Sequence, residues 1–254
     1  MKLEVLLSVM NITKQQLDEL PITSSCIVIN QSDKNDYEEY KNFKIYSYNE
    51  KGISRSRNKA LKHASADILL FCDDDIIYTE NYEKIILDAF KKNKKADVIF
   101  FNLDSPNRFV RKNKRNHKVH IYNALRYGTY NIALRKESIS KYNLCFNELF
   151  GNKEYYHHGE DTIFIVDCLK HKLRLYASKE NIGLVKQAKS SWFNGYNEKY
   201  FFDKGAIFNE ISNTFSHLLC LQYLLRYRKS FNNIKFLDAY KIMLKGVKSN
   251  KDEV

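Results

Sequence analysis

Short apolar runs alternate with amphipathic segments over the first hundred residues. Runs of strand type occupy Val5–Val9, Cys26–Asn30, Lys44–Ser47, Asp67–Cys72 and Val98–Phe101. Apolar positions at helical spacing predict helices at Lys14–Leu20, Ser54–His63 and Tyr82–Phe90, the last with Thr79 as its expected N-cap. This alternation predicts an α/β fold with a mostly parallel central sheet flanked by helices on both faces. Ligands of such sheets bind beyond the carboxyl ends of the strands.

The second half of the chain continues this pattern and then becomes helical. A further strand is expected at Thr129–Leu134, and a helix opens at Gly159-Glu160-Asp161. From about Gly205 two apolar stripes at helical spacing follow. They consist of Phe208, Ile211, Phe215, Leu218, Leu219 and Gln222, and of Ile234, Leu237, Tyr240, Leu244 and Val247.

These patterns predict one catalytic-type domain with a helical extension. We expect a domain over residues 1–205, with a nucleotide-binding half at about 1–105 and an acceptor half at about 106–205. Basic amphipathic helices should follow at 206–254, with Lys241, Lys245 and Lys248 beside the last apolar stripe. Such helices either lie on an anionic membrane surface or pack on the domain or on a second copy; the membrane interpretation is preferred.

Charge and cysteine content narrow the function classes. The 254 residues carry a formal net charge of +12, which suits nucleic acid, an anionic membrane or a phosphorylated substrate as a partner. Five cysteines without a CxxC pair argue against a disulfide scaffold or a zinc ribbon. No signal-peptide pattern and no run of about 18 apolar residues is found. A cytoplasmic protein is expected.

Three adjacent acids, Asp73-Asp74-Asp75, follow directly on an apolar strand. Carboxylates this close repel one another, and a hard divalent cation such as Mn²⁺ or Mg²⁺ relieves that repulsion because it prefers oxygen ligands. Such an ion also holds a diphosphate. The alternative interpretation is a solvated acidic turn.

Three other segments could take part in chemistry, and each also has a purely structural interpretation. Gly52–Asn58 opens a helix and carries two arginines. This arrangement suits either phosphate binding or a capped surface helix with solvated arginines. Glu160 and Asp161 suit either a catalytic base with an acceptor-binding partner or ordinary helix capping. The basic segment 106–119 suits either a mobile loop or contact with lipid phosphate or nucleotide. His157-His158 and the aromatic stretch Tyr196–Phe202 are expected to be structural rather than metal-binding or sugar-binding.

Taken together, three motifs resemble family 2 glycosyltransferases of the GT-A fold, in particular small bacterial members that build surface or capsular polysaccharides. The similar segments are Gly52–Asn58, the strand with its DxD motif at Ala66–Asp75, and Gly159-Glu160-Asp161. Ser190-Ser191-Trp192 and Lys204-Gly205 also look like such members. The resemblance covers roughly residues 3–205.

The resemblance implies an inverting transfer from a UDP-sugar to a hydroxyl of a glycan or glycolipid, with polyprenyl-diphosphate-linked acceptors common among relatives. Asp75 and Asp73 would hold Mn²⁺ or Mg²⁺, Asp161 would be the base, and Glu160 would bind the acceptor hydroxyl. The positions expected near the nucleotide are Asn30, Arg57, Asn58, Asp73 and Asp74.

The chain also departs from the family pattern. Asn30 replaces the Asp that often reads the uracil, and no His lies between His171 and His217 to serve as a late metal ligand. Tyr155-Tyr156-His157-His158 stands where relatives often carry a Trp, which would alter acceptor choice.

Two other function classes remain open at this point. A nucleotidyltransferase should show a glycine-rich loop after its first strand, but Val9–Thr13 contains no glycine. A non-catalytic module binding nucleic acid or anionic membrane would explain the charge but not the two acidic motifs, and no nucleic-acid partner is expected. The oligomeric state is not predicted.

Overall fold

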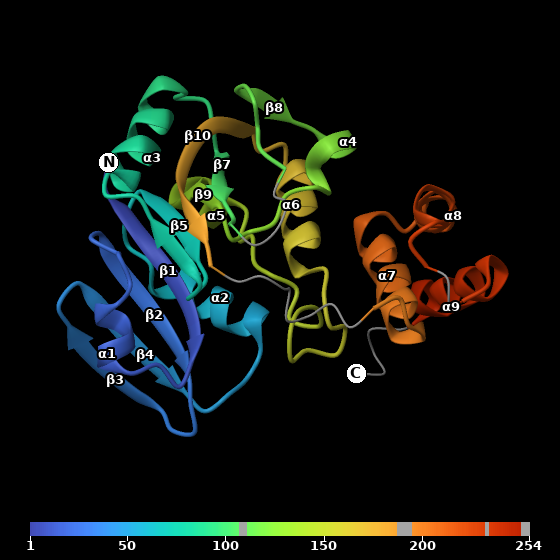
Figure 1. Cartoon of the computed structure of the whole chain (residues 1–254), viewed down its shortest axis with the longest axis horizontal. Helices are drawn as coiled ribbons and strands as arrows, with labels where there is room; N and C mark the ends of the chain where they lie inside the picture. The colour runs from blue at the N-terminus through green and yellow to red at the C-terminus, as the bar shows by residue number, and fades with distance from the viewer. Residues whose placement is uncertain (107–110, 187–194, 232–233, 250–254) are drawn as a thin grey trace.

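A computed structural model of the chain describes residues 1–106, 111–186, 195–231 and 234–249. The strands are β1 (Leu3–Met10), β2 (Ser25–Gln31), β3 (Asp36–Tyr40), β4 (Phe43–Tyr48), β5 (Ile68–Cys72), β6 (Ile76–Tyr78), β7 (Val98–Asp104), β8 (His117–Val119), β9 (Ile132–Arg135) and β10 (Leu175–Val185). The helices are α1 (Lys14–Asp18), α2 (Ile53–His63), α3 (Tyr82–Lys92), α4 (Ile121–Ala124), α5 (Lys136–Lys141), α6 (Glu160–Lys170), α7 (Glu198–Ile211), α8 (Ser216–Tyr227) and α9 (Phe236–Lys248). Figure 1 shows their arrangement.

One sheet runs through the α/β part of the molecule in the order β3-β4-β2-β1-β5-β9-β7-β10-β6, with β8 paired to β10. β4, β2, β1 and β5 are parallel neighbours, and β7 and β10 form a second parallel pair. β9 is antiparallel to both β5 and β7, so β7 points in the same direction as β5. The carboxyl ends of the parallel strands therefore share one edge, as the predicted fold requires.

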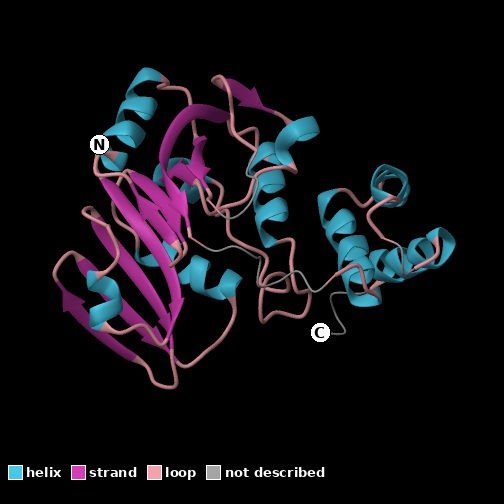
Figure 2. Cartoon of the chain, viewed as in Figure 1, coloured by secondary structure: helices cyan, strands magenta, loops and turns pink. Residues whose placement is uncertain are grey.

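Helices cover both faces of this sheet (Figure 2). Val5 and Leu7 of β1 point to the face covered by α1 and α3, where Tyr82, Ile86 and Phe90 are buried. The alternate residue Leu6 points to the opposite face, among apolar residues of α2, α5 and α6. Because successive side chains of a strand point to opposite faces, the continuous apolar runs in the sequence correspond to strands buried on both sides.

The C-terminal helices pack on the α/β part through a third apolar core. α7 and α9 contact each other closely: a Cβ at Gly205 would lie 1.9 Å from the Met243 carbonyl oxygen, and one at Gly246 would lie 1.9 Å from that of Phe202. Tyr156 and Ile163 belong to the same apolar core as Phe201 and Met243. The buried faces of these helices therefore pack on the α/β part of the chain. This packing was one of the alternatives to membrane binding.

Several local predictions were wrong at element boundaries. The C-terminal helical region begins at Glu198, not at Gly205, and the first predicted stripe is broken between Ile211 and Ser216, where the chain turns from α7 into α8. The buried face of α9 is Ala239, Met243 and Gly246, whereas Leu237 is 67% exposed. Among the described residues, no helix combines the length and the apolar character needed to cross a membrane.

Thr79 does not cap α3. That helix starts after Asn81, and the Thr79 hydroxyl instead donates to the carbonyl of Ile182 at 3.4 Å. The cause is the short strand β6, which pairs with β10 just before this point and directs the chain across the sheet edge.

Candidate active site

The three motifs singled out in the sequence meet at the carboxyl edge of the sheet. β5 ends at Cys72, which is buried, and Asp73 follows directly. α2 passes beside this strand end and carries Arg57. α6 opens at Gly159, whose φ of +110° is a conformation that glycine tolerates, and places Glu160 and Asp161 in its first turn.

Arg57 joins the acids of both motifs. Its side chain is only 6% exposed. Nη1 lies 2.8 Å from Asp161 Oδ1 and 3.3 Å from Glu160 Oε1, and Nη2 lies 3.5 Å from Asp73 Oδ1. Burial lowers the pKa of Arg57, but the three carboxylates outweigh burial and raise it well above its ordinary value. The guanidinium therefore stays charged and holds the acids together.

Asp161 is oriented by a second group of donors. Thr129 donates through its backbone N–H to Asp161 Oδ2 at 3.1 Å and through its hydroxyl to Oδ1 at 2.5 Å. A Cβ at Gly128 would lie 3.0 Å from Asp161 Oδ2, so this glycine lets the backbone approach the carboxylate closely. With these donors the carboxylate orientation is fixed, which a general base requires.

The electrostatics of the cluster favour proton uptake by one of its acids. Burial, together with the charge of Asp161, raises the pKa of Glu160 to about 7, against the opposing effect of Arg57. Removal from water likewise raises the pKa of Asp73, and Arg57 again opposes the increase. One arginine does not compensate three carboxylates, so the cluster keeps excess negative charge.

The donor set at Asp73–Asp75 fits a divalent cation only in part. Carboxylate oxygens are the ligands that Mn²⁺ and Mg²⁺ prefer. However, the described residues contain no group of three or more His, Cys, Asp or Glu side chains placed to hold a metal ion. Asp73 also faces Arg57 with one oxygen, while Asp74 is exposed. These residues therefore suit an ion that takes its remaining ligands from a diphosphate and water.

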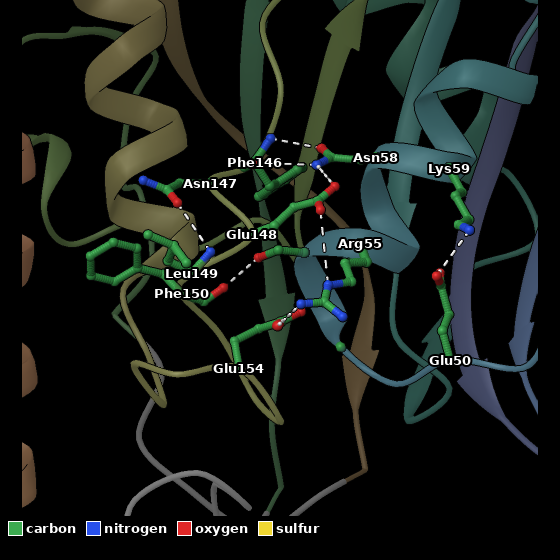
Figure 3. A network of polar contacts seen from close by, with 12 residues as sticks. Glu50, Arg55, Asn58, Lys59, Phe146, Asn147, Glu148, Leu149, Phe150 and Glu154 are labelled. Atoms are coloured by element: carbon green, nitrogen blue, oxygen red, sulfur yellow. Dashed lines mark hydrogen bonds and ion pairs between the residues drawn. The ribbon is translucent and has the colours of Figure 1, made fainter. Parts of the chain in front are cut away.

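Protein groups contact the N-terminus of α2, with Glu154 and Phe150 lying beside its first turn (Figure 3). The Ile53 N–H donates to the Asn152 carbonyl at 3.3 Å, and the Gly52 N–H donates to Gln31 Oε1 at 2.7 Å. The Ser54 hydroxyl donates to the carbonyl of Phe150. Glu154, whose side chain is 2% exposed, packs against Gly52. These groups therefore already have protein partners, and phosphate binding at this helix start stays a prediction.

Asn30 and Asn58 lie in other networks than the acid cluster. The Asn30 amide accepts from the Ile12 N–H at 3.0 Å and donates to the Ser47 hydroxyl at 3.0 Å. Asn58 exchanges two hydrogen bonds with the backbone of Phe146, at 2.7 and 3.0 Å, and so joins α2 to that segment (Figure 3). Both side chains have internal partners, and their contact with a nucleotide stays a prediction.

The histidine and aromatic segments are mostly structural, as expected. His158 is buried and stacks on Tyr200 with ring centroids 5.0 Å apart, and burial with nearby cations lowers its pKa to about 2. Tyr200 and Phe201 belong to the core around the C-terminal helices. Ser190-Ser191-Trp192 lies outside the described residues.

Sequence reasoning missed Thr129 and Glu154. Thr129 is fully buried and was expected only as a strand residue. Its single sequence signal is a polar residue beside Gly128 at the start of an apolar run. Glu154 gave no signal, because its burial depends on a loop that folds back over α2.

Solved structures with a similar fold match nearly the whole chain. S. aureus TarS 1–349 in complex with UDP-GlcNAc matches with a TM-score of 0.67 at 17% identity, covering 97% of this chain and 82% of that one. S. aureus TarS 1–349 alone matches with a TM-score of 0.64 at 16% identity, covering 98% and 81%. At these identities the likeness defines the architecture, a GT-A fold.

The sequence defines the family. The model of glycosyl transferase family 2 matches residues 23–158, more than half of the chain, and the protein belongs to this family. No curated protein sequence matched the chain. The enzyme class is thus a glycosyltransferase, and the nucleotidyltransferase and non-catalytic alternatives are set aside.

Proposed function

We propose that the chain is an inverting glycosyltransferase that moves a sugar from a UDP-sugar to a hydroxyl of a glycan or glycolipid in bacterial surface polysaccharide synthesis. The observation that carries this proposal is the convergence of Asp73 from the end of β5 and of Glu160 and Asp161 from the start of α6 on buried Arg57. A donor diphosphate and an acceptor hydroxyl need such neighbouring sites at one strand edge.

Asp161 is the proposed base. The acceptor oxygen attacks the anomeric carbon, the bond from that carbon to the UDP oxygen breaks, and the hydroxyl proton passes to Asp161 Oδ2. Among the described residues this oxygen accepts from the Thr129 N–H, and a carboxylate oxygen has a second lone pair that can take up a proton. Glu160, with its pKa raised to about 7, is the proposed partner of a second acceptor hydroxyl.

Asp73 and Asp75 are the proposed ligands of Mn²⁺ or Mg²⁺, with Asp74, Arg57, Asn30 and Asn58 on the nucleotide side. When bound, the cation would neutralise charge on the diphosphate leaving group. The choice of UDP is supported by the fold shared with a structure that holds UDP-GlcNAc. The donor sugar of this chain is not assigned.

Calorimetry of UDP binding, with and without Mn²⁺, is the first test. We expect metal-dependent binding that Asp75→Ala weakens. Asp161→Asn should bind UDP normally but lower turnover of an accepted donor and acceptor by at least about 100-fold, since it removes the base. Asp167→Asn, on the same helix with a partly exposed side chain that pairs with Lys170, is the matched control.

Two outcomes would contradict this assignment. Full transfer activity of Asp161→Asn would exclude it as the base. Absence of binding by UDP, GDP and dTDP, each with Mn²⁺, would refute the nucleotide site itself.

We also propose that the enzyme works in the cytoplasm, at the inner face of the membrane, and that α8 contacts lipid. Leu218 and Leu225 are seven residues apart, so they lie on the same face of α8. They are 60% and 55% exposed. Arg226, Arg228 and Lys229 follow at the end of this helix and are exposed. Apolar side chains bordered by cations suit an anionic lipid surface.

Co-sedimentation with phosphatidylglycerol vesicles tests this placement. Binding should weaken with salt and with Leu218→Ser/Leu225→Ser, and it should be absent with phosphatidylcholine vesicles. Equal sedimentation of the double variant would show that α8 is not the contact.

A further inference from the structure

A second concave site, with five cations in its lining, lies around the end of β7. It has a volume of about 1,000 Å³ and is lined by Arg111, Lys112, Lys114, Arg115 and Arg126, with Asp104 at the end of β7. Lys112 forms an ion pair with Asp104. Within the described parts of the chain, the other four cations have no carboxylate within ion-pair distance, so this basic cleft retains strong positive charge.

The basic cleft is built into the fold rather than carried on a loose flap. The Asn102 side chain on β7 accepts from the Asn113 N–H at 2.8 Å and donates to the Asn113 carbonyl at 3.1 Å. The buried Asn113 amide oxygen accepts from Arg126 Nη2 at 3.0 Å and from the Tyr127 hydroxyl at 3.0 Å. Tyr127 stacks on Phe100 with ring centroids 4.3 Å apart. Arg126 is therefore held in place before any ligand binds.

This cleft adjoins the proposed base. Arg126 and Thr129 lie in one short segment, and Thr129 donates two hydrogen bonds to Asp161. A narrower pocket shares Arg126 with the basic cleft and reaches Tyr130. A Cβ at Gly128 would lie 2.8 Å from the Tyr130 ring and 3.0 Å from Asp161 Oδ2, so ring and carboxylate flank the same glycine.

We infer that the basic cleft binds phosphate groups of the glycosyl acceptor, and so selects an acceptor that carries phosphodiester or diphosphate groups close to the hydroxyl to be glycosylated. This inference rests on the proposed function. The donor diphosphate is assigned to Asp73–Asp75 at the end of β5, whereas the cleft is formed around the end of β7 and its following segment. A neutral glycan would not use four uncompensated cations, while guanidinium groups match phosphate oxygens in geometry and charge.

The test compares two triple variants with the same change in charge. Arg111→Ala/Lys114→Ala/Arg115→Ala removes exposed cations of the cleft. Lys62→Ala/Lys94→Ala/Lys95→Ala removes three exposed cations that follow or end α2 and α3, at the opposite edge of the sheet. Each lowers the formal net charge of +12 by three.

The probes are farnesyl diphosphate for a lipid-linked diphosphate and linear polyphosphate for a phosphate polymer. Each is titrated at low salt with and without saturating UDP and Mn²⁺, and polyglutamate serves as a non-phosphate polyanion. We expect at least one phosphate probe to bind, and the cleft variant to bind it about tenfold more weakly, equivalent to ~1.4 kcal/mol. The control variant should bind as the unmodified protein does. Binding of only one probe identifies the source of the phosphate.

Three results would overturn the inference: no binding of either phosphate probe, equal losses in both triple variants, or polyglutamate binding as strong as that of the phosphates. UDP binding is recorded separately in each protein. Cleft-dependent phosphate binding without UDP binding would keep the phosphate site and refute the donor site, and the reverse pattern would refute the cleft alone.

Discussion

Replacement of Glu154 by Gln should stabilise the protein at alkaline pH. The Glu154 side chain is 2% exposed, and its Oε1 has no hydrogen-bond partner among the described residues. Arg55 Nη2 lies 3.5 Å from Oε2 and compensates the charge only in part (Figure 3). Burial raises the pKa of Glu154 from 4.5 to about 7, against the effect of Arg55. The ionised carboxylate is therefore unfavourable in the folded state.

The sign and size of the effect follow from this pKa. Because the pKa is raised on folding, the folded protein binds a proton between about pH 4.5 and 7 that the unfolded chain has released. The stabilisation by this proton is fully present below pH 4.5 and is lost as the pH rises through 7. A shift of this size corresponds to about 3 kcal/mol. Gln cannot ionise, and it gives up the attraction to Arg55, so we expect a net gain of about 1–3 kcal/mol above pH 8.

Urea unfolding between pH 5 and 9 measures the difference. Glu154→Gln should match the unmodified protein near pH 5 and become progressively more stable than it toward pH 9. Glu148→Gln is the matched control, because Glu148 also lies near Arg55 but its side chain is 53% exposed. Parallel stability curves for Glu154→Gln and the unmodified protein over this range would refute the reasoning.

Two further predictions concern Thr129 and Gly246. Thr129→Val keeps the N–H donor but removes the hydroxyl bond to Asp161, so turnover should fall about tenfold with UDP affinity unchanged; equal activity would show that the hydroxyl does not position the base. Gly246→Ala places a Cβ 1.9 Å from the Phe202 carbonyl oxygen and should lower the free energy of unfolding by about 1–3 kcal/mol. Urea unfolding checks this, with Lys245→Ala as control, and an unchanged midpoint would mean that α7 and α9 separate freely.

Much of the sheet was predictable because its strands are buried on both faces. β1, β2, β5 and β7 are mostly apolar, and the bounds of each were expected to within three residues. β3 was missed because its residues are almost all exposed and acidic or aromatic. It is an edge strand that depends on pairing with β4 rather than on burial.

The acid motifs were predictable, but their meeting point was not. A polar run after a buried strand is a local signal, and so is an acid pair at a helix start. Arg57 forms ion pairs with Asp161 and Asp73, which come from separate motifs along the sequence. The basic segment shows the same limit: its charge was visible, whereas its anchoring by Asn102 depends on a pairing between side chain and backbone across the sheet edge.

Arg57 explains why this cluster remains assembled although its charges do not balance. Its two terminal nitrogens reach acids from both motifs, so the guanidinium fixes the relative position of the strand end and the helix start. With three carboxylates and one cation, however, full ionisation leaves uncompensated negative charge, which adds to the effect of burial in raising the pKa of Glu160 to about 7. A cation placed at Asp73 would lower that pKa and favour the ionised form of Glu160. Through its contacts with Asp73 and Glu160, Arg57 links the charge at the end of β5 to the ionisation of Glu160.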